Sequence, residues 1–200
     1  MKILMIGGLL GSGKTTILLK LAKQFKDYYK NIIIIENEIG EIGIDGKYLQ
    51  NEGLQVQELY SGCICCTLSV DLVSTLEKLE SLYKPELVII ELSGVAYAAN
   101  VVEIIYKYLK ANFNLQVITI IDAVRYFIFK EMLFPLFVSN VEVADFLVVN
   151  KVDEIEKCDL NKIIADLQSL KELGQGKIIV TSSLKDNYCN NLWRELNNGT

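Results

Sequence analysis

The chain has 200 residues, of which 51% are hydrophobic and 22% are charged, and its formal net charge is −5 with no histidine. This length allows one domain with a full hydrophobic core, and the composition excludes disordered, collagen-like and low-complexity proteins. The acidic balance disfavours a nucleic-acid binder, which usually presents a basic surface. The absence of histidine excludes a Ser-His-Asp triad and imidazole metal ligands, so a metal site would use Cys, Asp, Glu, backbone or water.

Short apolar runs alternate with amphipathic stretches of helical length. Strands are predicted at Lys2–Ile6, Asn31–Ile35, Leu54–Leu59, Glu86–Ile90, Leu115–Ile121, Phe146–Val149 and Lys177–Val180. Helices are predicted at Lys14–Lys26, Leu68–Leu82, Ala98–Lys110, Ala123–Ala144 with a break at Pro135, Leu160–Leu173 and Tyr188–Leu196. Continuous Ile, Val and Leu runs are typical of parallel strands covered on both faces. The pattern predicts a three-layer α/β fold with a doubly wound, mostly parallel sheet, as a single domain over residues 1–200 without a second C-terminal domain.

No apolar run approaches the ~18 residues of a membrane span, and the apolar N-terminus is interrupted at Gly7 and Gly8. We therefore expect neither a signal peptide nor a membrane partner. The five cysteines are an odd number, and three of them fall within four residues, which does not suggest a disulfide framework. This usage favours a reducing, cytoplasmic location.

The unusual residues of the chain follow the predicted strands. They form the segments Gly7–Thr15, Asn37–Asp45, Cys63–Cys66, Glu91–Gly94, Asn150–Asp153 and Ser182–Ser183. In open α/β sheets, ligands bind outside the carboxyl ends of the strands. The sequence therefore predicts one composite site at that edge.

Residues Gly8–Thr15 match the phosphate-binding pattern G-x-x-x-x-G-K-[ST], between a predicted strand and a predicted helix. The glycines allow successive N–H groups to face one anion, and the helix N-terminus adds partial positive charge. Lys14 is predicted to reach the β- and γ-phosphates, and the Thr15 hydroxyl to bind Mg²⁺. The residues predicted to contact the phosphates are Gly8, Gly11, Ser12, Gly13, Lys14, Thr15 and Thr16.

The segment Asn150-Lys151-Val152-Asp153 is predicted to recognise the base. The Asp153 carboxylate would accept two hydrogen bonds from guanine, whereas adenine presents an acceptor at the same ring position, which favours GTP over ATP. Lys151 would lie over the base plane, Asn150 would brace the loop, and Ser182 is assigned to the same nucleotide site. The competing interpretation is that Asp153 caps the following helix.

Two acidic segments are candidates for magnesium and catalysis. Glu91 would hold a Mg²⁺-bound water, and Gly94 would offer its N–H to the γ-phosphate, which makes both catalytic candidates together with Lys14 and Thr15. Glu38 and Asp45 lie in a glycine-containing segment and are further candidate magnesium ligands. The competing interpretations are a turn with a solvated Glu91 and a purely structural loop over Asn37–Asp45.

Cys63, Cys65 and Cys66 form a candidate transition-metal site. Thiolates are soft ligands that suit Zn²⁺, and three of them leave a fourth position for water, a carboxylate or an acceptor protein's ligand. Such an incomplete shell suits metal transfer. The same residues could instead be small buried side chains or redox-active thiols.

Together, the segments GGLLGSGKTT, NEIGEIGID, GCICC, ELSG, IIDA and VADFLVVNKVD resemble the CobW-type GTPases, a P-loop group that includes UreG and HypB. The resemblance implies a GTP-dependent metallochaperone or cofactor-insertion protein. It implies Mg²⁺ with GTP at Lys14, Thr15 and Glu91, and Zn²⁺, or else Co²⁺ or Ni²⁺, at the cysteines. It also implies GTP and GDP as ligands, a client metalloprotein or corrinoid protein, and a homodimer. Three departures from the usual family pattern are noted: we expect no second C-terminal domain, the sequence has no histidine-rich stretch, and Asn140 stands where the family usually has glutamine.

The leading hypothesis is a slow GTPase that carries metal. A small-molecule kinase is disfavoured because its lid needs several arginines, and this chain has only Arg125 and Arg194. Two further hypotheses are a non-catalytic zinc-binding or dimerisation module, and a GTPase that serves a corrinoid protein or methyltransferase.

Overall fold

The computed structural model describes residues 1–36, 55–58, 68–170, 176–184, 192 and 194–196. Its centre is a sheet of seven described strands in the order β3-β2-β4-β1-β5-β6-β7, and every neighbouring pair is parallel. The strands are β1 (Lys2–Gly8), β2 (Ile32–Glu36), β3 (Gln55–Glu58), β4 (Leu87–Glu91), β5 (Asn114–Asp122), β6 (Phe146–Asn150) and β7 (Lys177–Val180). The predicted doubly wound α/β fold is confirmed.

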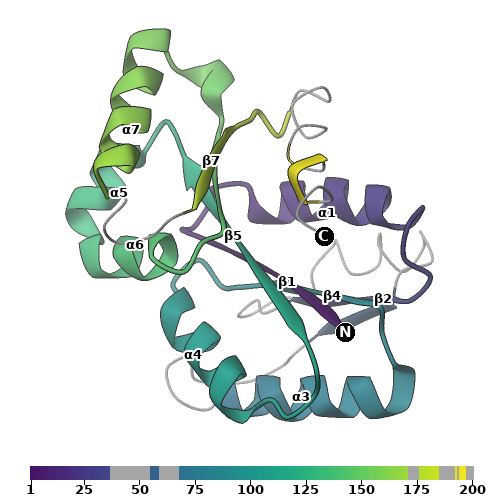
Figure 1. Ribbon diagram of the computed structural model, residues 1–200. Helices are drawn as coiled ribbons and strands as arrows, with labels where there is room; N and C mark the ends of the chain where they lie inside the picture. Colours follow the sequence, from purple (N-terminus) through teal and green to yellow (C-terminus); the bar gives the residue numbers. More distant parts are fainter. Residues whose placement is uncertain (37–54, 59–67, 171–175, 185–191, 193, 197–200) are drawn as a thin grey trace.

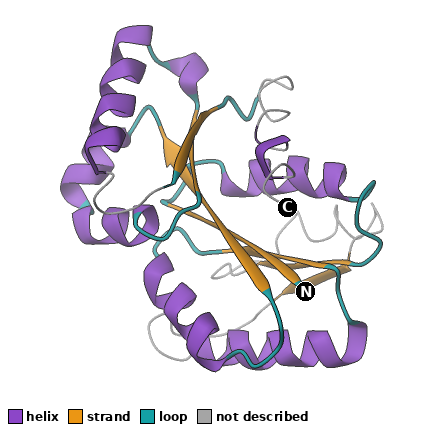
Figure 2. Cartoon of the chain, in the orientation of Figure 1, coloured by secondary structure: helices purple, strands orange, loops and turns teal. Residues whose placement is uncertain are grey.

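The described helices cover both faces of the sheet (Figures 1 and 2). They are α1 (Lys14–Phe25), α3 (Leu68–Tyr83), α4 (Ala98–Tyr108), α5 (Tyr126–Met132), α6 (Phe134–Val141) and α7 (Lys157–Ser169), with a short 3₁₀ helix at Val152–Glu154. Helix α1 lies on one side of the sheet, and α3 and α4 lie on the other (Figure 1). None of the helices among these described residues has the length and apolarity needed to span a membrane.

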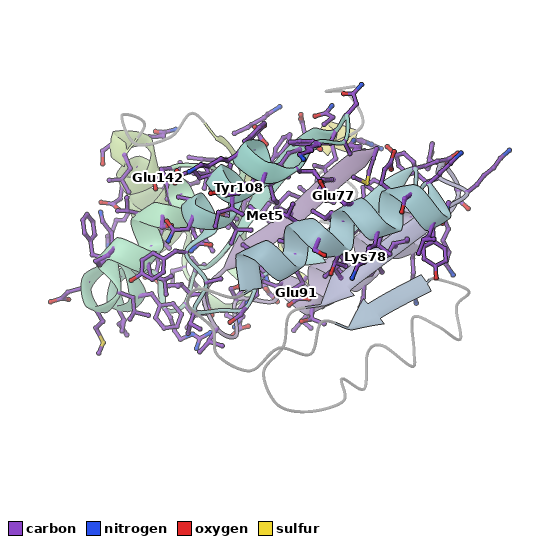
Figure 3. All side chains as sticks on the ribbon, turned by 90° about the horizontal axis from the view of Figure 1, so that it is seen from below. Met5, Glu77, Lys78, Glu91, Tyr108 and Glu142 are labelled. Atoms are coloured by element: carbon purple, nitrogen blue, oxygen red, sulfur yellow. The ribbon has the colours of Figure 1, made fainter. Side chains whose placement is uncertain are left out.

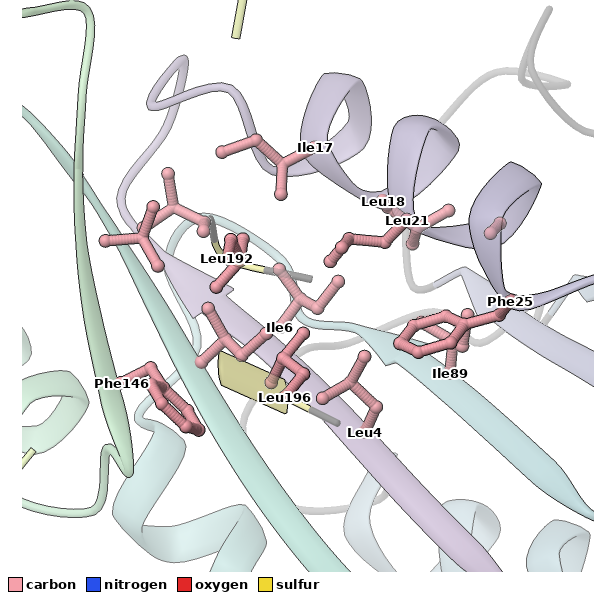
Figure 4. Close-up of a cluster of buried hydrophobic side chains, with 14 of the residues drawn as sticks. Leu4, Ile6, Ile17, Leu18, Leu21, Phe25, Ile89, Phe146, Leu192 and Leu196 are labelled. Atoms are coloured by element: carbon pink, nitrogen blue, oxygen red, sulfur yellow. The ribbon is translucent and has the colours of Figure 1, made fainter. Parts of the chain in front are cut away.

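The face of the sheet under α1 is sealed by aliphatic packing (Figure 4). Alternate side chains of β1, Leu4 and Ile6, point to this face because successive side chains of a strand point in opposite directions. They meet Ile17 and Leu21 of α1, whose spacing of four residues places them on one side of that helix. This packing fixes the start of α1 directly behind the carboxyl end of β1.

The opposite face carries two further clusters. Ile3 and Met5 of β1 pack with residues of α3 and α4, and Figure 3 shows α3, labelled at Glu77 and Lys78, lying across the face that carries Met5. Beside them, Ile121 and Val149 pack with residues of α5, α6 and α7. The sheet is therefore covered on both sides, which explains why its strands are nearly continuous Ile, Val and Leu.

The segment between β5 and β6 forms two helices and not one, and the break lies near the proline, as predicted. Helix α5 ends at Met132, and α6 begins at Phe134 with Pro135 in its first turn, where a missing N–H removes no helical hydrogen bond. Helix α7 begins at Lys157, three residues before the predicted start at Leu160. Helices α5 and α7 are linked by Asp166 of α7, which accepts hydrogen bonds from Tyr126 Oη at 2.6 Å and Lys130 Nζ at 2.6 Å.

Candidate nucleotide-binding site

The parallel sheet brings four of the predicted segments to one edge. In the register of the sheet, Ile6 of β1 lies beside Glu91 of β4, and Gly8 lies beside Ile120 of β5. Asp122 at the end of β5 lies beside Asn150 at the end of β6. Loops that follow these strands therefore begin close together, as the carboxyl-edge rule requires.

Residues Gly8–Thr15, here called the phosphate-binding loop, curl back between β1 and α1. Gly8, Gly11 and Gly13 have φ angles of 130°, 67° and 97°, which side-chain-bearing residues rarely adopt. Gly13 is the N-cap of α1, so Lys14, Thr15 and Thr16 form the first turn of that helix. The buried Lys14 donates from Nζ to the Leu9 carbonyl at 3.3 Å, across the loop. The N-terminus of α1, where an anion is favoured, thus lies at the end of this loop.

Hard oxygen donors meet at the first turn of α1. The Thr15 hydroxyl donates to Glu91 Oε1 at 2.7 Å, across the gap between α1 and the end of β4, and Figure 3 labels Glu91 at the tip of its strand. A hydroxyl and a carboxylate are ligands that suit Mg²⁺. Gly94 lies against the phosphate-binding loop, because a Cβ there would lie 2.7 Å from the Leu10 nitrogen. The donor set fits a magnesium ion held beside a bound phosphate.

We expect Glu91→Gln to weaken Mg²⁺-dependent GTP binding about tenfold, because the amide removes a charged hydrogen-bond acceptor beside the metal. GTP binding in the presence of EDTA should stay unchanged. Calorimetric titrations with and without Mg²⁺ measure both quantities. Glu86→Gln is the matched control, since Glu86 precedes the opposite end of β4, where its carboxylate accepts from the Lys30 N–H at 2.7 Å. An equal loss in EDTA would contradict a role at the metal.

Asn150 joins the second candidate segment to the phosphate-binding loop. Its side-chain Nδ2 donates to the Ser12 carbonyl at 2.8 Å and to Ser183 Oγ at 3.2 Å, and its Oδ1 accepts from the Ser183 N–H at 2.8 Å. The amide is completely buried. A Cβ on Gly13 would clash with Asn150 Nδ2, so this approach also requires glycine at position 13. Three loops from β1, β6 and β7 therefore meet at one side chain.

The whole segment Asn150–Asp153 is here called the base-recognition loop, after its predicted role. Asp153 lies in the 3₁₀ helix Val152–Glu154, and the N-cap of α7 is Glu156, so Asp153 does not occupy the capping position that the competing interpretation gives it. Ser182 follows β7 and is completely buried. The hydroxyls of Ser12, Thr181 and Ser182 have no hydrogen-bond partner within the described part of the chain. Buried hydroxyls of this kind usually find a partner, so these three fit a site that a polar ligand completes.

Three residues at the site make contacts that the motifs do not predict. Asn140 Oδ1 accepts from the Gly8 N–H at 3.0 Å, and its Nδ2 donates to the Leu136 carbonyl at 2.9 Å, which supports the start of the phosphate-binding loop. Asp122 accepts from Lys151 Nζ at 2.8 Å. Arg125 donates to both Asp122 and the Leu10 carbonyl. Two signals could have pointed to two of them, because Asp122 directly follows the predicted strand Leu115–Ile121 and Arg125 is one of only two arginines.

The surroundings of Asp122 favour the ionised form of its carboxyl group. Burial alone raises the pKa of its carboxyl group, but the hydrogen bonds and charges of Lys151 and Arg125 outweigh that effect and hold the pKa below its usual range. The side chain is fully buried, whereas Lys151 and Arg125 are 26% and 38% exposed. A buried carboxylate with two cations thus lies between the two loops.

The remaining predicted ligands lie outside the described residues. These are Glu38 and Asp45 for magnesium, and Cys63, Cys65 and Cys66 for the transition metal. Within the described ranges, no cluster of three or more Cys, Asp or Glu side chains is arranged to hold a metal ion. Cys158 is described, is exposed, and forms no disulfide. The cysteine site therefore stays a prediction.

Residues 2–176 match the family model described as CobW/HypB/UreG, nucleotide-binding domain. The zinc chaperone YjiA of Escherichia coli (strain K12) is 31% identical over 159 residues, which cover 74% of this chain and 48% of YjiA. The zinc chaperone CobW of Sinorhizobium sp is 41% identical over 98 residues, which cover 46% of this chain and 27% of that protein. The chain thus spans about half or less of the length of these relatives.

Solved structures share the fold. The hydrogenase maturation factor HypB from Archaeoglobus fulgidus superposes with a TM-score of 0.71 at 18% identity, over 98% of this chain and 88% of that chain. Zn(II)-bound YjiA GTPase from E. coli superposes with a TM-score of 0.57 at 23% identity, over 84% of this chain and 54% of that chain. At these identities the superpositions establish the architecture alone.

Proposed function

The chain belongs to the CobW/HypB/UreG nucleotide-binding family of P-loop GTPases, and we propose that it binds GTP with Mg²⁺, hydrolyses it slowly, and serves as a metallochaperone. Zinc is the metal we propose as cargo, because similar proteins are named zinc chaperones and three thiolates suit that ion. A client metalloprotein in the cytoplasm would receive it.

One observation carries the nucleotide part of the proposal. The Asn150 amide bonds the Ser12 carbonyl at 2.8 Å and also Ser183, so a guanine-type recognition motif and a phosphate-binding loop share one sheet edge. Asp153, in the 3₁₀ helix that precedes α7, is proposed to accept the ring N–H and the exocyclic amine of guanine. This arrangement supports preference for GTP over ATP.

The proposed hydrolysis uses few catalytic groups. Water attacks the γ-phosphorus, the bond to the β–γ bridging oxygen breaks, and GDP and phosphate leave. Lys14 is proposed to balance charge on the phosphates, while Thr15 and Glu91 hold Mg²⁺, which supplies further charge neutralisation when bound. GTPases without an arginine supplied by a partner protein turn over at about 10⁻⁴–10⁻² s⁻¹. Arg125 is engaged by Asp122 and the Leu10 carbonyl, which supports this slow range.

The metal part of the proposal rests on Cys63, Cys65 and Cys66. In the chain, this cluster follows β3, whose backbone pairs with β2, and β2 pairs with β4, which ends at Glu91. A metal site that follows β3 would thus begin at the same edge of the sheet as the proposed magnesium site. Metal occupancy and nucleotide state are then proposed to influence each other, and the influence must be reciprocal.

A calorimetric GTP titration with Mg²⁺, run with and without one equivalent of Zn²⁺ under reducing conditions, tests the coupling. We expect Zn²⁺ to change GTP affinity about fivefold or more in the unaltered chain. The variant with Cys63→Ala, Cys65→Ala and Cys66→Ala should bind GTP but lose the zinc effect. Cys158→Ala is the matched control, because it removes an exposed thiol outside the cluster and should retain the effect. If GTP affinity is the same with and without zinc, the coupling is refuted, and the chain is then better described as a GTP switch without a metal function.

A further inference from the structure

Asp122 is the point at which the base-recognition loop and the phosphate-binding loop meet. It is the last residue of β5, and its neighbour in the sheet register is Asn150, the last residue of β6. One carboxylate oxygen, Oδ2, accepts from Lys151 Nζ at 2.8 Å and from Arg125 Nη2 at 2.6 Å. The two cations therefore reach the same atom from different segments of the chain.

Arg125 extends this contact to the phosphate-binding loop. Its Nε donates to Asp122 Oδ2 at 2.9 Å, and its Nη2 donates to the Leu10 carbonyl at 2.9 Å. The guanidinium also lies over Gly11, because a Cβ at that position would be 2.7 Å from Arg125 Nη2. A planar guanidinium presents several donors in fixed directions, so it can hold the carboxylate and the carbonyl together. Leu10 and Lys151 are thus linked through two side chains.

We propose that Asp122 is a positioning residue for guanine-nucleotide recognition, which sets Lys151 for the base and, through Arg125, fixes the phosphate-binding loop for the phosphates. This inference rests on the proposed GTP-binding function and deepens it. Asp122 itself touches neither base nor phosphate in the proposal. It acts by holding two loops in the geometry that the nucleotide needs.

The backbone of Lys151 explains why the lysine needs such support. Its φ angle is 64°, a left-handed conformation that non-glycine residues adopt at a cost in free energy. Without the ion pair, the long Lys151 side chain would be ordered only when the nucleotide binds, and the lost conformational entropy would lower the affinity. The ion pair with Asp122 orders the ammonium group beforehand, and preorganisation of this kind improves affinity.

The two oxygens of Asp122 separate a structural role from a positioning role. Oδ1 accepts from the backbone N–H groups of Val124 at 3.0 Å and Arg125 at 3.2 Å, which holds the turn after β5. Oδ2 accepts from the two cationic side chains. Asp122→Asn retains one acceptor for the turn but places an N–H₂ group against two donors. The substitution therefore releases Lys151 and Arg125 while it leaves the turn contacts possible.

The test is the GDP affinity of Asp122→Asn, Lys151→Met, Arg125→Ala and their pairs, measured by calorimetry. We expect Asp122→Asn to weaken GDP binding about 10- to 100-fold, the range that loss of a charge-assisted hydrogen bond gives. Because Asp122 acts through Lys151, the pair Asp122→Asn with Lys151→Met should lose less than the product of the single losses.

A second readout distinguishes positioning from general damage. Inosine diphosphate lacks the exocyclic amine that Asp153 is proposed to bind. Asp122→Asn should weaken GDP and inosine diphosphate by the same factor, because the edge contact is untouched, so their affinity ratio should stay that of the unaltered chain. Asp166→Asn is the matched control: Asp166 also accepts from a lysine and lies between elements, yet it accepts from Lys130 and Tyr126 of α5 and from no residue of either loop. Its GDP affinity should stay within twofold of the unaltered chain.

Asp122→Asn with GDP affinity within twofold of the unaltered chain, or fully multiplicative pairs, would overturn the inference. If Asp122→Asn fails to fold, Lys151→Met with Arg125→Ala, which keeps Asp122, decides instead. If this double variant loses more GDP affinity than the product of the two single losses, the shared carboxylate is supported, because both cations are then missing from one buried charge. If its loss equals that product, the inference is refuted. An unaltered chain that binds ADP as well as GDP would refute the proposed function itself, and the inference with it.

Discussion

Asp153→Asn is expected to lower GTP affinity at least a hundredfold and to shift the preference of the chain towards XTP. The carboxylate is proposed to accept two hydrogen bonds from guanine, and loss of two charge-assisted bonds at ~1.5–3 kcal/mol each gives a reduction of about this size. The asparagine amide offers one acceptor and one donor. Xanthine matches that pair, because a carbonyl replaces its exocyclic amine. Calorimetric titration of both proteins with GTP and XTP measures the change.

Glu154→Gln is the control for the loss of negative charge. Glu154 lies next to Asp153 in the same 3₁₀ helix and is exposed, so its variant removes the same charge without the proposed base contact. We expect GTP affinity within twofold of the unaltered chain. If Asp153→Asn and Glu154→Gln behave alike, guanine is not recognised by Asp153, and the nucleotide preference must come from another part of the site.

Gly8→Ala is expected to destabilise the fold by about 4 kcal/mol and to lower its Tm by about 10 °C. Gly8 has a φ of 130°, and a Cβ there would clash with the carbonyl oxygen of Ile120. That carbonyl belongs to β5, whose backbone lies beside Gly8 in the sheet register, so neither strand is free to move away. Backbone strain and the clash add to each other. Thermal unfolding followed by circular dichroism measures the loss.

Leu10→Ala serves as the comparison in the same loop. The Leu10 side chain is 60% exposed, so its truncation should change the free energy of unfolding by no more than about 0.5 kcal/mol. If the Gly8→Ala and Leu10→Ala proteins have the same Tm, the sheet accommodates a side chain at position 8. The strained start of the phosphate-binding loop would then not be a requirement of the fold.

The conformation of residues Gly8–Thr15 was predictable because its requirements are local. A backbone that turns through three positive φ angles needs Gly8, Gly11 and Gly13, and α1 begins directly after them at Lys14. The same holds for the base-recognition loop, where a hydrophobic strand ends at Asn150. In each case a short run of sequence contains both the motif and the strand that positions it.

The sequence predicts the boundaries of the helices less accurately than it predicts the two loops. The sequence predicts a helix break at Pro135, and the proline occurs in the first turn of α6, as its missing N–H favours. The start of α7 falls at Lys157 and not at Leu160, because Ile155 and the 3₁₀ helix before it pack into the cluster under β6. Apolar periodicity locates the buried face of a helix, but the first turn depends on what the preceding loop contacts.

The contacts of Asn140, Asp122 and Arg125 were not predictable from motifs. Asn140 Oδ1 reaches the Gly8 N–H across 132 positions of sequence, and Arg125 Nη2 reaches the Leu10 carbonyl across 115. A parallel sheet forms such pairs by bringing strands from distant parts of the chain to the same edge. None of these residues belongs to a pattern that specifies its partner.

The α/β class, the positions of the two candidate loops and the edge of the sheet at which they meet follow from sequence alone, because strand periodicity, glycine spacing and the carboxyl-edge rule act over short stretches of chain. Which side chains link those loops depends on how the strands are arranged in three dimensions. Asp122 and Arg125 are neighbours in one turn, but Asp122 reaches Lys151 because β5 lies beside β6, and Arg125 reaches the Leu10 carbonyl because β5 lies beside β1. A buried carboxylate needs cationic partners, and the packing of the sheet determines which distant cation can reach it.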